Sequence, residues 1–231
     1  MSITLRKENS GATMDLRADT KMHTARFAGL FAQPSLGRPV YDHLLLKTDG
    51  CVVAPTLGSI VPGWLLVIPR VRAINFSRFA EISAINPHEL IQDVLHRLGV
   101  SNSRAIWFEH GPPEIGSLLG CGVDQAHLHI IIDPPFGLDA FEAQAREVSE
   151  LEWAREPVAS VYSTIKTGGS YLVAGSGGRA IIAEDVDRVG SQFFRRVVAD
   201  LVAKPDCWNY KTHPFIENVR ETLRTFGSTH V

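Results

Sequence analysis

Residues 121–132 read CGVDQAHLHIII, and the alternation in this stretch decides how the rest of the chain is interpreted. Alternate side chains of a β-strand share a face, so Gln125, His127 and His129 are expected to point one way. The residues expected on the other, core-facing side are Ala126, Leu128, Ile130 and Ile132. Polar alternation alone is typical of a strand with one solvated face. Histidine is an uncommon choice for such a face, and this favours a functional strand.

A glycine-rich loop, GPPEIGSLLGCG at 111–122, leads directly into this strand. Loops of this kind present backbone N–H groups that can cradle phosphate oxygens. A second glycine-rich stretch, at 175–178, precedes RAIIAE, which has the pattern of a strand rather than of a helix start. The second stretch therefore predicts a hairpin and not a dinucleotide-binding loop.

The composition of the 231-residue chain is that of a soluble globular protein, with 45% hydrophobic and 21% charged residues. A formal net charge of −2 gives no strong signal for nucleic-acid or membrane binding. The three cysteines form no C-x-x-C pair, which argues against a zinc site and fits free thiols in a reducing compartment. No apolar block marks a signal peptide or a membrane span, so we expect a cytoplasmic protein.

The apolar periodicity predicts an α+β fold with a mainly antiparallel sheet, flanking helices and a C-terminal α/β extension. We expect a poorly ordered segment at 1–25, because little of it can be buried. Strands are predicted at 41–54 (two, joined by a turn), 64–68 and 104–109, and helices at 87–98, 140–153, 191–203 and 215–226.

Several segments together resemble the histidine-triad superfamily. QAHLHII at 125–131 fits the His-x-His-x-His frame of that family with Gln125 in the first position. PTLGSIVPGWLLVIPR at 55–70 resembles the upstream strand pair of the family, and WFEHG at 107–111 resembles a segment of one of its branches. SQFFRR at 191–196 and WNYKTHPFIEN at 208–218 resemble the C-terminal extension of that branch.

The resemblance implies hydrolysis or transfer of a nucleoside phosphate through a covalent nucleotidyl-histidine, with no metal and no cofactor. The middle histidine of the frame, His127, would attack the α-phosphorus, and His129 would donate to the phosphate oxygens. The loop groups expected to help are Ser117 and the amides of Gly120 and Gly122. The family also leads us to expect a homodimer and a HIT-like fold, with a catalytic domain at 26–138 and a C-terminal helical and hairpin extension at 139–231 packed on it.

Gln125 is the departure from the family pattern, because glutamine keeps a donor and an acceptor but cannot serve as an acid. One alternative is therefore a nucleotide-binding sensor or scaffold whose catalysis is impaired. A shifted frame that makes His129 the nucleophile stays open but is disfavoured. A weaker alternative is a metal-dependent hydrolase that uses His110, His127 and His129.

Three further side chains are candidates for binding the nucleotide or its phosphates. Glu109 and His110 end a predicted strand beside the loop, either as a structural pair or as groups at the edge of the site. Arg195 lies on a predicted helix, either with a solvated head group and a packed stem or as a phosphate clamp. The resemblance favours the second interpretation, in which Arg195 clamps a phosphate.

Overall fold

A computed structural model of the chain describes residues 27, 30, 39–117 and 124–227. The strands are β1 (Leu46–Lys47), β2 (Cys51–Pro55), β3 (Trp64–Pro69), β4 (Ala105–Gly111), β5 (Leu128–Ile132), β6 (Ala154–Pro157), β7 (Tyr171–Ser176) and β8 (Arg179–Glu184). They form one sheet in the order β1-β2-β3-β5-β4-β7-β8-β6, and each pair of neighbours is antiparallel. The predicted α+β class with a mainly antiparallel sheet is confirmed.

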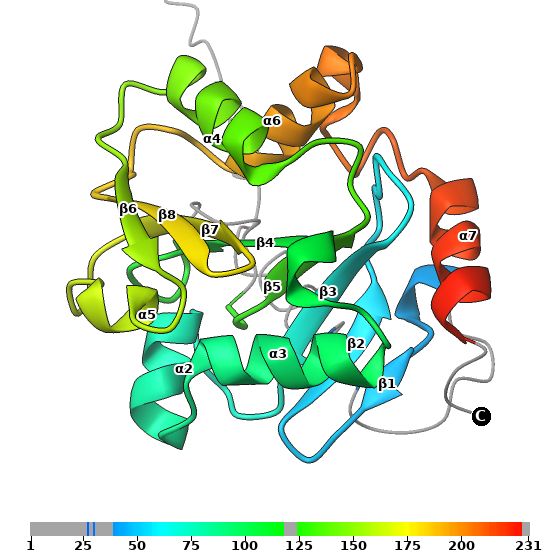
Figure 1. Cartoon of the computed structure of the whole chain (residues 1–231), viewed down its shortest axis with the longest axis horizontal. Coiled ribbons are helices and arrows are strands. Elements are labelled where there is room, and N and C mark those ends of the chain that lie inside the picture. The colour runs from blue at the N-terminus through cyan, green and yellow to red at the C-terminus, as the bar shows by residue number, and fades with distance from the viewer. Residues whose placement is uncertain (1–26, 28–29, 31–38, 118–123, 228–231) are drawn as a thin grey trace, which may run out of the picture.

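Helices cover both faces of this sheet (Figure 1). They are α2 (Phe76–Ser83), α3 (Pro87–Arg97), α4 (Leu138–Glu147), α5 (Val161–Thr164), α6 (Phe193–Leu201) and α7 (Ile216–Phe226). Helices α2, α3 and α5 bury apolar side chains in a core on one face, and α4 and α6 do so on the other. Each face of the central strands therefore lies in a dry core. In the part of the chain that the structure describes, no helix is long and apolar enough to cross a membrane.

Local sequence signals account for the helix starts. The side chain of Asn86 accepts a hydrogen bond from the His88 amide at 2.9 Å, and Pro87 occupies the first helical position of α3. Asn75 caps α2 in the same way, accepting from the Arg78 amide at 2.8 Å. Helix α2 was not predicted, although its Asn cap and apolar spacing are readable in the sequence.

The predicted helix at 140–153 is wrong in its second half. Helix α4 ends at Glu147, Val148 is 41% exposed, and the chain turns back to form the edge strand β6. An ion pair holds the reversal, because Arg155 of β6, whose side chain is exposed, donates to the buried Glu142 carboxylate of α4 at 2.9 Å. Tertiary pairing overrides the helical periodicity here. The first strand predicted in 41–54 is reduced to β1, because Val40–Asp42 form a 3-10 helix. The other predicted helices and strands are present with small shifts at their ends.

The C-terminal part of the chain completes the same sheet and does not form a separate one. The hairpin of β7 and β8 pairs with β4, so the sheet continues from the N-terminal strands into the predicted extension. Helix α7 returns to the N-terminal strands, where buried Thr222 accepts a hydrogen bond from the Gly63 amide at 2.9 Å. Gly63 has φ 76° and lies in the turn immediately before β3. This contact fixes α7 against the turn that enters β3.

Replacing Thr222 with valine should lower the free energy of unfolding by about 1–3 kcal/mol, because the buried Gly63 N–H loses its acceptor while the side-chain volume is kept. Denaturant unfolding followed by circular dichroism measures this. Thr225→Val is the matched control: Thr225 is exposed on the same helix, and its hydroxyl donates only to the Glu221 carbonyl. Equal losses in the two variants would contradict the assigned role of Thr222.

Candidate active site

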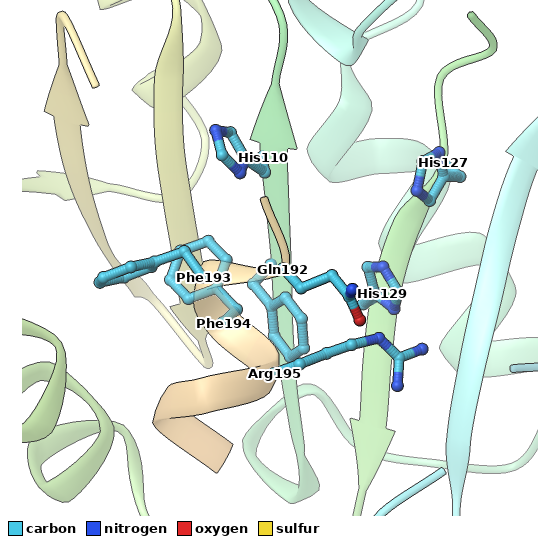
Figure 2. A pocket seen from close by; sticks show the side chains of 8 residues that line it. His110, His127, His129, Gln192, Phe193, Phe194 and Arg195 are labelled. Carbon is cyan, nitrogen blue, oxygen red and sulfur yellow. The ribbon is translucent and has the colours of Figure 1, made fainter. Parts of the chain in front are cut away.

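Two adjacent strands bring three histidines to one face of the sheet. The register of β4 and β5 pairs Phe108 with His129. His110 lies two residues after Phe108, and His127 lies two residues before His129, so both project to the face of His129. All three line one pocket, which Figure 2 shows between the strands and α6. The predicted separation of faces is confirmed for β5, since Leu128, Ile130 and Ile132 lie in the opposite core.

His129 is held as a neutral hydrogen-bond donor. The indole Nε1–H of Trp64 donates to Nδ1 of His129 at 3.0 Å, and the indole nitrogen can only donate. Nδ1 is therefore the acceptor, and the ring proton sits on Nε2. Burial lowers the pKa of His129 well below its ordinary value, and the nearby His127 and Arg195 charges act in the same direction. Phe108 stacks on the imidazole with ring centroids 5.1 Å apart.

His127 is held in the opposite tautomer. Its Nδ1 lies 2.9 Å from the main-chain oxygen of Gln125, which can only accept, so Nδ1 carries the proton. The lone pair is then on Nε2. The ring is half-buried, and its centroid is 5.5 Å from those of His129 and Phe27. When its ring is neutral, His127 thus carries a lone pair on Nε2, beside the Nε2–H donor of His129.

Helix α6 provides the other wall of the pocket. Its residues there are Gln192 at the N-cap, Phe193, Phe194 and Arg195, and Phe108 completes the lining. The space open to the centre of a water-sized molecule is ≈ 20 Å³. That is enough for roughly one or two waters, or for a group of phosphoryl size, but not for a nucleoside. No carboxylate is among the lining residues, so the wall favours an anion.

Arg195 is buried beside the histidines. Its guanidinium donates to the Gly58 carbonyl at 2.6 Å, and to the Thr56 hydroxyl and the Leu57 carbonyl at 2.9 Å. It also lies over the Trp64 ring, 4.8 Å from the centroid. A β-carbon at position 58 would meet Tyr210 at 2.4 Å, so a glycine with φ 75° allows this packing. Arg195 therefore fixes the 56–58 loop and adds positive charge to the pocket.

Gln125 lies outside the pocket lining. The chain bends at 124–125 and β5 begins only at Leu128, so the predicted alternation does not extend to this residue. Its side-chain amide donates to the carbonyls of Pro69 and Val71, at 3.1 and 3.4 Å. The amide thus ties the start of β5 to the end of β3, and the main-chain oxygen of the same residue orients His127.

Glu109 lies on the opposite face of β4 from the pocket, because it is one residue from His110 on the same strand. Its carboxylate is buried, accepts from the Phe76 amide at 2.7 Å, and accepts from the hydroxyls of Tyr162 and Tyr171 at 3.1 and 2.7 Å. Burial raises its pKa to about 7, against these hydrogen bonds, which lower it. The structure therefore separates Glu109 and His110, which sequence analysis grouped together.

The remaining predicted residues belong to the loop before β5. Ser117 is described, and it is not among the residues that line the pocket. Gly120 and Gly122 lie outside the described residues. Within residues 39–117 and 124–227, no group of three His, Cys, Asp or Glu side chains is arranged to hold a metal ion.

Sequence analysis missed two residues that shape the site. Gln192 reaches the pocket only because α6 packs across the sheet, and no local pattern signals this. The hydrogen bond of Trp64 to His129 depends on the pairing of β3 with β5. Both contacts depend on long-range packing and not on residue spacing.

Comparisons with known proteins add little to this geometry. No model of a known protein family matches the chain, and no curated protein sequence matches it. Among solved structures, the chain is similar to the crystal structure of a yeast Ap4A phosphorylase in complex with AMP. The TM-score is 0.42 and the sequence identity 12%, over 88% of this chain and 81% of that one. A likeness this weak supports no conclusion about function, which must come from the residues of the pocket.

The raised pKa of Glu109 predicts a specific pH dependence of stability. The native carboxyl keeps its proton up to about pH 7, whereas the unfolded carboxyl loses it near its ordinary value of 4.5. The native state therefore binds more protons between these values, and the Glu109 contribution to stability falls as the pH rises from about 4.5 to 7. The full effect is on the order of 3 kcal/mol.

Glu109→Gln removes this titration while keeping a polar side chain of the same size. Denaturant unfolding at pH 5 and pH 8 should show the variant gaining stability relative to the unmodified protein as the pH rises. Glu114→Gln, which changes an exposed carboxylate, is the control and should show a constant difference. A constant difference for Glu109→Gln as well would contradict the raised pKa.

Proposed function

We propose that the chain is a nucleotidyl hydrolase or transferase that uses His127 as its nucleophile. The observation that carries the proposal is the pair of opposite tautomers on one strand, with a lone pair on His127 Nε2 and an N–H on His129 Nε2. A neutral imidazole is a competent nucleophile near pH 7. The phosphoryl-sized, carboxylate-free pocket supports a phosphate ester as substrate. The nucleoside part comes from the resemblance of the quoted segments to the histidine-triad superfamily.

The reaction has two displacements. In the first, the Nε2 lone pair of His127 forms a bond to the α-phosphorus, and the bond from phosphorus to the leaving oxygen breaks with its electron pair. The imidazolium that results keeps its proton on Nδ1, which donates to the Gln125 carbonyl oxygen. In the second, a water or another acceptor attacks the same phosphorus and loses a proton, and the bond between nitrogen and phosphorus breaks. His127 returns to its starting tautomer.

Charge in the transition state is stabilised by groups that are already in place. The His129 Nε2–H donates toward the equatorial phosphate oxygens, and the Arg195 guanidinium adds a buried positive charge. Both groups are fixed by other contacts. His129 is held by its hydrogen bond from Trp64, and Arg195 is held by its hydrogen bonds to the 56–58 loop. Such preorganised donors need little rearrangement when the negative charge develops.

A second function is favoured by the placement of Gln125. Its side chain is engaged by two main-chain carbonyls, so the pocket lacks a first triad group that could transfer a proton. A protein that binds a nucleotide without turning it over, as a sensor or scaffold, would be consistent with this. The two functions differ in one observable, the covalent adduct on His127.

Incubation with adenosine 5′-phosphoramidate or a dinucleoside polyphosphate should give an acid-labile nucleotidyl adduct on His127, detected by mass spectrometry of intact protein and peptides. His127→Asn should abolish the adduct and reduce turnover by on the order of 10³-fold or more, because asparagine supplies no nucleophilic nitrogen. His96→Asn, on the exposed side of α3, is the control and should behave as the unmodified protein.

Three outcomes separate the alternatives. An adduct that persists in His127→Asn would assign the nucleophile to His129. Nucleotide binding without adduct or turnover in the unmodified protein would favour the sensor or scaffold. Activity lost on chelation and restored by a divalent cation would favour a metal-dependent hydrolase.

Trp64→Phe should lower kcat by about tenfold or more with little change in KM, because His129 loses the donor that fixes its proton on Nε2. The adduct should still form on His127, and the pH profile of kcat should shift as His129 becomes free to change tautomer. Trp107→Phe is the matched control, since Trp107 is equally buried in the sheet but in the opposite core. Equal losses of kcat in the two variants would show that Trp64 acts only through packing, and not through its hydrogen bond to His129.

A further inference from the structure

We propose that the pocket between α2, α5 and the start of α3, the α2–α5 pocket, is a second ligand site. It binds a small organic cation that carries a primary ammonium group on an apolar body. The α2–α5 pocket lies on the face of the sheet that α2, α3 and α5 cover, whereas the histidines face α6 on the other side (Figure 1). Binding at this site is therefore separate from the reaction proposed for His127.

The α2–α5 pocket is much larger than the pocket of the histidines. The space open to the centre of a water-sized molecule is ≈ 390 Å³ here and ≈ 20 Å³ there. Ligand pockets commonly have volumes of about 300–1,000 Å³, so a molecule of metabolite size fits. The walls are held by the buried Glu109 carboxylate, which accepts from the Phe76 amide of α2 and from the Tyr162 hydroxyl of α5. The cavity is thus formed before a ligand binds.

More than half of the lining residues are apolar or aromatic. They are Ala80, Ala84, Ile85, Pro87, Ala159, Tyr162 and Ile165. Tyr162 and Ile165 are buried and belong to the core, whereas Ile85 is 38% exposed. A ligand that covers Ile85 gains free energy because it removes this apolar surface from water. The lining therefore suits the apolar body of a ligand.

Ser77 provides a buried polar group without a partner. The residue is 9% exposed and lines the α2–α5 pocket. Its amide donates to the Tyr171 hydroxyl at 3.1 Å, but its own hydroxyl makes no hydrogen bond in the part of the chain that the structure describes. Buried polar groups are normally paired, so this hydroxyl points to a ligand group. Its oxygen can accept a hydrogen bond from an ammonium group.

Glu81 places a carboxylate beside this hydroxyl. It follows Ser77 by four residues on α2, so the two side chains lie on one face of the helix. Among the described residues that line the α2–α5 pocket, Glu81 is the one charged side chain. Arg78, which is not in the lining, donates to Oε2 of Glu81, and no described residue donates to Oε1. An ammonium group has three N–H donors and can bond to both Ser77 and Glu81.

The surrounding charges also favour a cation. The Tyr162 hydroxyl donates at 3.1 Å to the Glu109 carboxylate, so a second acidic group lies behind the aromatic wall. Burial raises the pKa of Glu109 to about 7, and the group is therefore mostly ionised at pH 8. Lys166 follows Ile165 of the lining, but its ammonium is paired with Glu184 and Asp185. An anion would meet negative charge here, whereas a cation is also attracted by the aromatic ring.

Isothermal titration of the full chain at pH 8 with three probes of one shape tests the site. Tryptamine carries an ammonium group on an indole-ethyl body, tryptophol carries a hydroxyl on the same body, and indole-3-acetate carries a carboxylate. We expect tryptamine to bind about tenfold tighter than tryptophol or more, because hydrogen bonds of a charged group are the stronger ones. Indole-3-acetate should not bind. Phenethylamine, a smaller primary amine, is titrated as a second cation.

Three variants locate the binding. Ser77→Ala should weaken tryptamine binding by about tenfold and leave the melting temperature unchanged, because the hydroxyl has no partner in the chain to lose. Glu81→Gln should weaken it by about threefold, since an exposed ion pair contributes little. Ala159→Phe places a ring in the cavity from an exposed position and should abolish binding of tryptamine and tryptophol. Glu221→Gln, an exposed carboxylate on α7, is the control.

Each of three results would overturn the cation site. The first is no binding of either tryptamine or phenethylamine at millimolar concentration. The second is an affinity for indole-3-acetate equal to that for tryptamine, which would contradict the selection by charge. The third is unchanged tryptamine affinity in Ser77→Ala and Ala159→Phe, both folded by circular dichroism, which would place the ligand elsewhere on the molecule.

Discussion

The hydrogen bond from the Trp64 indole to Nδ1 of His129 is the contact on which the pocket depends. It joins β3 to β5 at a buried position, and the same indole lies under the Arg195 guanidinium of α6. Because the indole can only donate, the proton of His129 must face the pocket. One interaction therefore sets the tautomer of a site residue and joins the two strands and the helix that enclose it.

The same reasoning changes the meaning of Gln125. The sequence departs from the triad frame at this position, yet His127 takes its tautomer from the main-chain oxygen of residue 125, which any residue type supplies. The glutamine side chain has a separate task, since it ties the chain bend to the end of β3. The side chain at 125 is thus not required to orient the proposed nucleophile. Compared with a histidine at this position, glutamine lacks a group for acid–base catalysis.

The sequence was sufficient to predict the antiparallel sheet and the shared face of His127 and His129, because both follow from the period of two in a strand. The same period of two, applied to β4, places Glu109 and His110 on opposite faces of the sheet. The positions of Gln125 and Gln192 could not be predicted. The first depends on a bend that ends the alternation, and the second depends on how α6 packs across β4 and β5. Local spacing carries no information about either.

The pocket also shows how the C-terminal segment and the histidines depend on each other. The burial that keeps His110 and His129 neutral comes in part from α6, more than 60 residues after β5 in the sequence. Without that helix the imidazoles would be solvated and would titrate near their ordinary pKa. With it, Arg195 adds a buried positive charge to the lining, and His110 and His129 stay neutral. A phosphate that enters the pocket can therefore change the protonation of these histidines. Its negative charge stabilises the charged form of each imidazole, which is the form that burial disfavours.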